Sequence, residues 1–131
     1  DDVIGLRRLI LYGMRGCCAY AEHAHILGKE DTTIYADLVK MMDYLASRPT
    51  DIGEMLAKSL EVGEINVRIM ELLDAAGTER FGHPEPTRVR VTPLKGKCIL
   101  VSGHDMVDLE AILKQTEGKG INIYTHGARL R

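Results

Sequence analysis

Residues 95–127 read KGKCILVSGHDMVDLEAILKQTEGKGINIYTHG, and this stretch decides the fold class. The continuous apolar run Cys98–Val101 is bounded by glycines, which is typical of a buried parallel strand. Asp105 is suited to cap a helix that continues through Leu113, and Ile121–Tyr124 has the pattern of a second strand. A strand, a helix and a strand within about 30 residues predict a right-handed βαβ unit.

The chain upstream of this unit has the apolar spacing of helices. We expect helices from Asp2 to Leu27 with a stop at Gly28, from about Asp31 to residue 47, and from residue 50 or 51 to Ala76 with a stop at Gly77. Glycines at positions 5, 13 and 16 of the first helix suggest that another helix approaches it closely. Short links between the helices predict an antiparallel three-helix bundle.

The predicted fold is therefore mainly α with an α/β part, a three-helix bundle followed by the first βαβ unit of a Rossmann-like parallel sheet. The expected division is a bundle over residues 1–77, a proline-containing connector over residues 78–94, and the start of an incomplete α/β domain over residues 95–131. A sheet of two strands is marginal by itself, so we expect the unit to continue in a longer parent chain or to pair with another copy.

Composition excludes several classes of function. The chain has 131 residues, 45% of them hydrophobic, and a formal net charge of -2, so it lacks the basic footprint of a nucleic-acid-binding protein. It has no apolar run of the roughly 20 residues that a membrane helix requires. Three cysteines, two of them adjacent, argue against a disulfide framework and favour the reducing cytoplasm.

The sharpest candidate site is His104, which follows the first predicted strand where open α/β folds place ligands. His126 follows the second strand, so both histidines are expected at one edge of the sheet. Judged from these residues alone, a surface-loop histidine is the stronger interpretation, because zinc sites normally need three or four ligands. Adjacent helical residues point about 100° apart, so Cys17 and Cys18 do not easily bind one ion, and a packed cysteine is the expected role. Cys98 is expected to be a small core residue.

The motifs Ser-Gly-His-Asp at residues 102–105 and Tyr-Thr-His-Gly at residues 124–127 resemble those of the hybrid-cluster proteins, also called prismane or hydroxylamine reductase proteins. Residues 63–87, GEINVRIMELLDAAGTERFGHPEPT, resemble the last bundle helix and connector of that family. The first helix and residues 27–31 match more loosely, so the resemblance covers nearly the whole chain.

This resemblance implies a fold similar to that of carbon monoxide dehydrogenases and two iron–sulfur clusters in the parent family. One is an ordinary cluster near the N-terminus, and the other is a hybrid iron–sulfur–oxygen cluster held by one histidine, two glutamates and four cysteines. His104 stands at the position of the cluster histidine, and His126 is expected near it without binding the iron. The family's first glutamate ligand corresponds to Ala128, where this sequence departs, and the departure continues through residues 129–131. Cys17, Cys18 and Cys98 match no ligand position, although iron–sulfur sites need several thiolates.

The resemblance implies a truncated internal fragment of a cytoplasmic iron–sulfur oxidoreductase that reduces hydroxylamine or a related small nitrogen species. We expect the parent to be an enzyme and this chain alone to be inactive, with no iron–sulfur cluster bound and no catalytic or cofactor-binding residue assigned. Its expected partners are the remaining domains of the parent or another copy of the chain, and neither nucleic acid nor a membrane. One alternative is a helical and α/β interaction module that self-associates or binds a protein partner. Another is a small-ligand module that uses His104 and His126.

Overall fold

The computed structural model describes residues 1–126, and the chain divides into two compact units between His83 and Pro84. The first unit contains the helices α1 (Asp2–Ile26), α2 (Thr32–Ala46) and α3 (Ile52–Phe81). The second contains β1 (Lys97–Val101), α4 (Met106–Thr116) and β2 (Ile121–Thr125). The predicted fold class, helices followed by a small parallel sheet with its own helix, is confirmed. The finer domain bounds stay a prediction.

Local capping signals set most helix ends in the first unit. Asp31 accepts a hydrogen bond from the backbone N of Thr33 at 2.8 Å at the start of α2. Asp51 accepts one from the backbone N of Glu54 at 2.7 Å at the start of α3. At the end of α1, Gly28 has a φ of +90°, and the backbone N atoms of residues 28 and 29 donate to the carbonyls of residues 25 and 24. This is the Schellman arrangement, which places glycine after the helix as expected.

The predicted end of the third helix at Gly77 is wrong, because α3 continues to Phe81 and ends at Gly82. A glycine inside a helix costs about 1 kcal/mol relative to alanine, which tertiary contacts can offset. Here Ala76 is buried, and Lys29 after α1 forms an ion pair with Glu79 on the last turns of α3. The left-handed φ of +81° at Gly82 then ends the helix.

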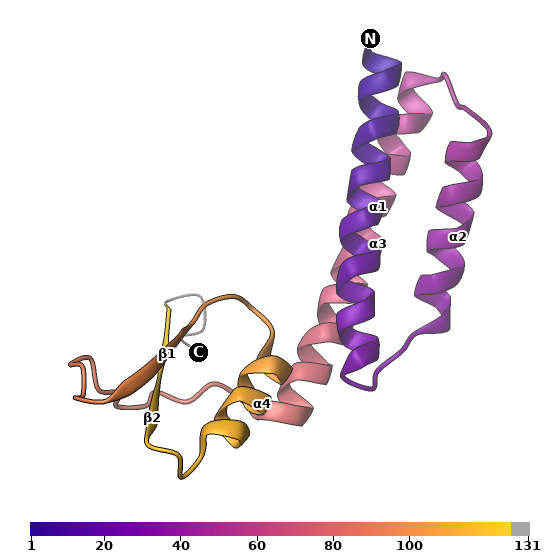
Figure 1. Ribbon diagram of the computed structural model, residues 1–131. Coiled ribbons are helices and arrows are strands. Elements are labelled where there is room, and N and C mark those ends of the chain that lie inside the picture. The colour runs from indigo at the N-terminus through magenta and orange to yellow at the C-terminus, as the bar shows by residue number, and fades with distance from the viewer. Residues whose placement is uncertain (127–131) are drawn as a thin grey trace. The chain divides into compact units, whose positions relative to one another are not determined.

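The three long helices share one aliphatic core. Figure 1 shows α1 and α3 side by side and running in the same direction. α2, which connects them in the sequence, runs in the opposite direction. The core consists of buried side chains from all three helices: Ile10, Met14, Cys17, Ala21, Ile34, Leu38, Met41, Met55, Val62, Ile65 and Ile69. The expected close approach of a helix occurs at Gly13, where an added Cβ would lie 2.9 Å from Cγ1 of Val62. Gly5 and Gly16 make no such approach.

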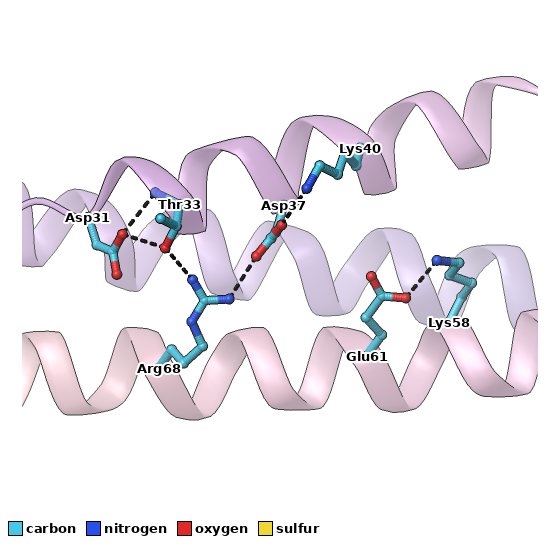
Figure 2. A network of polar contacts seen from close by, with 7 residues as sticks. All are labelled: Asp31, Thr33, Asp37, Lys40, Lys58, Glu61 and Arg68. Carbon is cyan, nitrogen blue, oxygen red and sulfur yellow. Dashed lines mark hydrogen bonds and ion pairs between the residues drawn. The ribbon is translucent and has the colours of Figure 1, made fainter.

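A polar network joins α2 to α3 beside this core (Figure 2). Arg68 on α3 donates from Nη1 to Oδ2 of Asp37 at 2.7 Å and from Nη2 to Oγ1 of Thr33 at 2.6 Å. The Thr33 hydroxyl in turn donates to the capping carboxylate of Asp31 at 2.6 Å. Lys40 contacts the other oxygen of Asp37 at 3.0 Å. The network therefore links the cap of α2 to the middle of α3, and the Arg68 guanidinium holds the pKa of Asp37 below its usual value.

The second unit is a βαβ unit in which β1 and β2 are parallel, with Lys97 opposite Ile121 and Val101 opposite Thr125. Asp105 caps α4 by accepting hydrogen bonds from the backbone N atoms of residues 107 and 108 at 2.8 and 3.1 Å, as expected. The prediction that the first strand is buried is wrong, because of its five residues only Val101 is buried. Two strands and one helix provide too little surface to cover both faces of the sheet.

No helix in the part of the chain that the structure describes is long and apolar enough to cross a membrane.

Candidate functional site

The carboxyl ends of β1 and β2 lie next to each other because the strands are parallel and Val101 pairs with Thr125. His126 extends this pairing, since its backbone N donates to the carbonyl of Val101 at 3.0 Å. His104 follows β1 by three residues and precedes the cap of α4. Both predicted histidines therefore leave the sheet at its carboxyl edge, where open α/β sheets place ligands.

The turn between β1 and α4 presents His104 to solvent. Gly103 has a φ of +118°, a conformation that L side chains rarely adopt, so the turn needs glycine immediately before the histidine. Asp105 then starts α4 with an extended backbone, φ −77° and ψ 111°. His104 and His126 are both exposed, so either imidazole can contact a bound metal or ligand without first leaving an apolar interior.

The described residues do not gather a metal-binding set around either histidine. Among residues 1–126, no group of three or more histidine, cysteine, aspartate or glutamate side chains is placed to hold a metal ion. Ala128, the position where the resemblance expects a glutamate, lies outside the described residues, as do residues 129–131. The assignment of His104 as an iron ligand accordingly stays a prediction.

Cys98 differs from its expected role. It is exposed on β1 instead of packed in a core, because α4 contacts β2 and the outer surface of β1 stays open. It pairs with Asn122 in the register of the sheet, three residues before the strand ends at Val101. Cys98 is thus neither a core residue nor part of a described metal-binding group.

Cys17 and Cys18 have different environments, because their side chains point about 100° apart on α1 and only Cys17 packs against α3. Cys17 is buried, and its Sγ lies 3.8 Å from the carbonyl of Val62 and 3.8 Å from Oδ1 of Asn66 on α3. Burial raises the pKa of the Cys17 thiol, which disfavours the thiolate that metals bind. The prediction of a packed cysteine is confirmed for Cys17 and wrong for Cys18, which is exposed.

A shallow pocket near the end of α1 is the feature that sequence reasoning missed. Cys18, Glu22 and His25 line it from one face of α1, at a spacing of four and three residues. Glu30 and Tyr35 also line it, and Nδ1 of His25 contacts a carboxylate oxygen of Glu30. Burial and the nearby carboxylate of Glu30 raise the pKa of Tyr35. The helical spacing was visible in the sequence, but the loop that brings Glu30 back to His25 was not.

Comparison with known proteins matches the whole chain. The model of the Prismane/CO dehydrogenase family matches residues 1–131. A hydroxylamine reductase of Acidithiobacillus ferrooxidans is 57% identical over 130 residues, which is 99% of this chain and 23% of that relative. The chain therefore spans less than a quarter of the length of this curated relative.

Proposed function

The chain belongs to the prismane/CO dehydrogenase family, and from this premise we propose that it forms part of an iron–sulfur oxidoreductase that reduces hydroxylamine or a related small nitrogen species. The identity to a hydroxylamine reductase extends over 130 residues and is not confined to one motif, which supports a shared reaction. Since the chain spans 23% of that relative, the proposed enzyme includes much polypeptide beyond these residues. Its setting is the cytoplasm, and its partners are the other domains of the same protein.

Within that enzyme, we assign to His104 the role of one iron ligand. The observation that carries this assignment is the exposed imidazole on the turn between β1 and α4, at the carboxyl edge of the parallel sheet. Imidazole nitrogen binds iron well, and His104 directly follows the tight turn at Gly103, so it lies between the end of β1 and the start of α4. His126, which follows the neighbouring strand, is positioned near this edge and serves to shape the surroundings of the ligand.

The described residues do not fit a complete iron–sulfur cluster. Such clusters are held mainly by thiolates, and the cysteines of this chain are dispersed over α1 and β1. Cys17 is additionally unsuitable, because it is packed against α3 and its thiol pKa is raised. The remaining ligands must come from other parts of the longer protein, so the 131-residue chain alone binds no cluster and has no reductase activity.

Anaerobic reconstitution of the 131-residue chain with iron and sulfide tests this last point. We expect no stable visible absorption band and no stoichiometric iron after desalting. A stable band in proportion to the protein would contradict the proposal that the ligand set is completed elsewhere.

The role of His104 is tested in the longer protein with His104→Ala and the matched variant His126→Ala. Both residues are exposed, so neither change should disturb folding measured by circular dichroism. Loss of a direct ligand should lower the bound iron and alter the electron paramagnetic resonance spectrum, whereas His126→Ala should retain the cluster. Full iron content and an unchanged spectrum in His104→Ala would refute the assignment.

A further inference from the structure

α3 carries a row of exposed apolar side chains on the surface that its neighbours leave open. Leu56, Leu60, Val67 and Met70 are all exposed, and Leu60 and Val67 retain 73% and 57% of their accessible surface. With Gly63 between them, these positions alternate in steps of four and three residues, which is the spacing of a helix–helix seam. No atom beyond its own stretch of helix lies within 4 Å of where a Cβ of Gly63 would be.

α1 carries a second row of the same kind. Leu9, Tyr12 and Tyr20 are exposed, and Gly5 and Gly16 lie on the same side of the helix at steps of three and four residues. Like Gly63, these two glycines have open space where a side chain would be. Exposed apolar residues in rows interrupted by glycine are typical of a surface that another helix approaches closely.

The two rows border the contact between α1 and α3. Gly13 contacts Val62, and Cys17 contacts Asn66. Because α1 and α3 are parallel, each residue of α1 therefore lies at the same height as the residue of α3 that is 49 positions later in the sequence. On α1, Leu9 and Gly16 are the helical neighbours of Gly13. On α3, Gly63 and Met70 are likewise the helical neighbours of Asn66, three and four residues away from it.

The two rows also lie on the sides of α1 and α3 that α2 does not occupy. α2 contacts α3 through Arg68, and it contacts α1 near Cys18, and neither residue belongs to the rows. The rows therefore form one continuous surface, which we call the α1–α3 face. It consists of Gly5, Leu9, Tyr12, Gly16, Tyr20, Leu56, Leu60, Gly63, Val67 and Met70.

Charged residues at the two edges of the α1–α3 face are of opposite sign. Arg8 and Arg15 lie along its edge on α1, and Glu64 and Glu71 lie along its edge on α3. Arg15 and Glu64 are 49 positions apart, so they stand at the same level across the face. This face is best matched by a helix that has an apolar seam, with acidic residues on the side toward α1 and basic residues on the side toward α3.

We propose that the α1–α3 face binds an amphipathic helix from the same longer polypeptide, outside residues 1–131. The inference rests on the proposed function, in which this chain is part of a longer reductase. The chain spans 23% of its reductase relative, so the full protein has ample length to supply such a helix. A segment of the same polypeptide is held near the face at an effective concentration on the order of millimolar, which favours it over a second copy.

Cysteine labelling compares the face with a matched control position. Val67→Cys on the α1–α3 face and Val39→Cys on α2 start from similarly exposed valines, 57% and 64%. In the 131-residue chain, both thiols should react rapidly with an alkylating reagent, as read at peptide level by mass spectrometry. In the longer protein, the Val67→Cys thiol should react at least about tenfold more slowly, because a packed thiol reacts only on local opening. The Val39→Cys thiol should keep its rate.

The native methionines give the same test without any substitution. Met70 lies on the α1–α3 face and Met42 on α2, with exposed fractions of 41% and 59%. Brief peroxide treatment should oxidise both in the 131-residue chain and spare Met70 in the longer protein. Both readouts are independent of bound iron, so they also distinguish failure of this proposal from failure of the proposed function.

Two results would overturn the proposal. Equal labelling of the Val67→Cys thiol in the 131-residue chain and in the longer protein would show that no helix of that protein covers the face. Protection that grows with the concentration of the 131-residue chain, accompanied by a dimer in light scattering, would make a second copy the occupant instead.

Discussion

Substituting Gly13 by alanine tests the closest approach between α1 and α3. The added Cβ would lie 2.9 Å from Cγ1 of Val62, whereas carbon atoms in ordinary contact are about 3.5–4.0 Å apart. Val62 is buried and β-branched, and its χ1 has essentially one favourable rotamer in a helix, so the methyl group cannot rotate away. The helices must separate instead, or the backbone must shift.

The expected change in the free energy of unfolding combines two opposing effects. Overpacking of a well-packed core costs about 1–3 kcal/mol. Replacing glycine by alanine inside a helix contributes about 1 kcal/mol in the other direction. Gly13→Ala should therefore destabilise the first unit by as much as about 2 kcal/mol, the overpacking cost less the helix-propensity gain.

Gly16→Ala is the matched control, because Gly16 lies in the same helix with no atom of another element within 4 Å of the added Cβ. This variant has the gain in helix propensity without the overpacking, so it should stabilise the 131-residue chain by about 0.5–1 kcal/mol. The propensity effect cancels in the comparison, and the difference between the two variants should be about 1–3 kcal/mol.

Urea unfolding followed by far-UV circular dichroism provides the measurement, with the m-value as a check that the same surface unfolds. A double-mutant cycle with Val62→Ala isolates the contact, since Gly13→Ala should become harmless when Cγ1 is absent. If Gly13→Ala proves as stable as Gly16→Ala, the inferred close packing of α1 on α3 is incorrect.

Three further predictions concern the polar contacts and the cysteines. Arg68→Gln should lower the urea midpoint at neutral pH. The hydrogen bond from Arg68 keeps the folded-state pKa of Asp37 low, so the ionised carboxylate stabilises the fold above the ordinary pKa of about 4 and this contribution is lost in more acidic solution. The difference between Arg68→Gln and the unmodified chain should therefore shrink as the pH falls below that value, and a constant difference would count against the pairing. Asp51→Ala should cost about 1 kcal/mol by removing the cap of α3, whereas Asp51→Asn should retain most of it, and equal unfolding midpoints for the two would argue against the cap. Alkylation of the folded chain should modify Cys18 and leave Cys17 unreacted until urea unfolds α1, as peptide mapping would reveal, and early modification of Cys17 would contradict its burial.

The position of the candidate site was predictable from the sequence to a useful degree. A short apolar strand, a glycine, a histidine and a capping aspartate follow one another within a few residues, so His104 had to lie between a strand and a helix. Parallel pairing then places His126 at the same edge. The sequence was less informative about the strand itself, because a run such as Cys98–Val101 is equally apolar whether or not other elements cover it.

Signals between residues close in sequence determined the caps of α2, α3 and α4, the glycine after α1 and the order of strand and helix in the second unit. These features depend on hydrogen bonds across one turn and on the period of the apolar residues, both of which are legible in the amino-acid order. Tertiary structure alone decided that α3 passes through Gly77, that Gly13 meets Val62, and that Cys17 is buried while Cys18 is exposed. Each of these outcomes depends on which side of a helix meets a neighbour far away in sequence, and no local interaction specifies that.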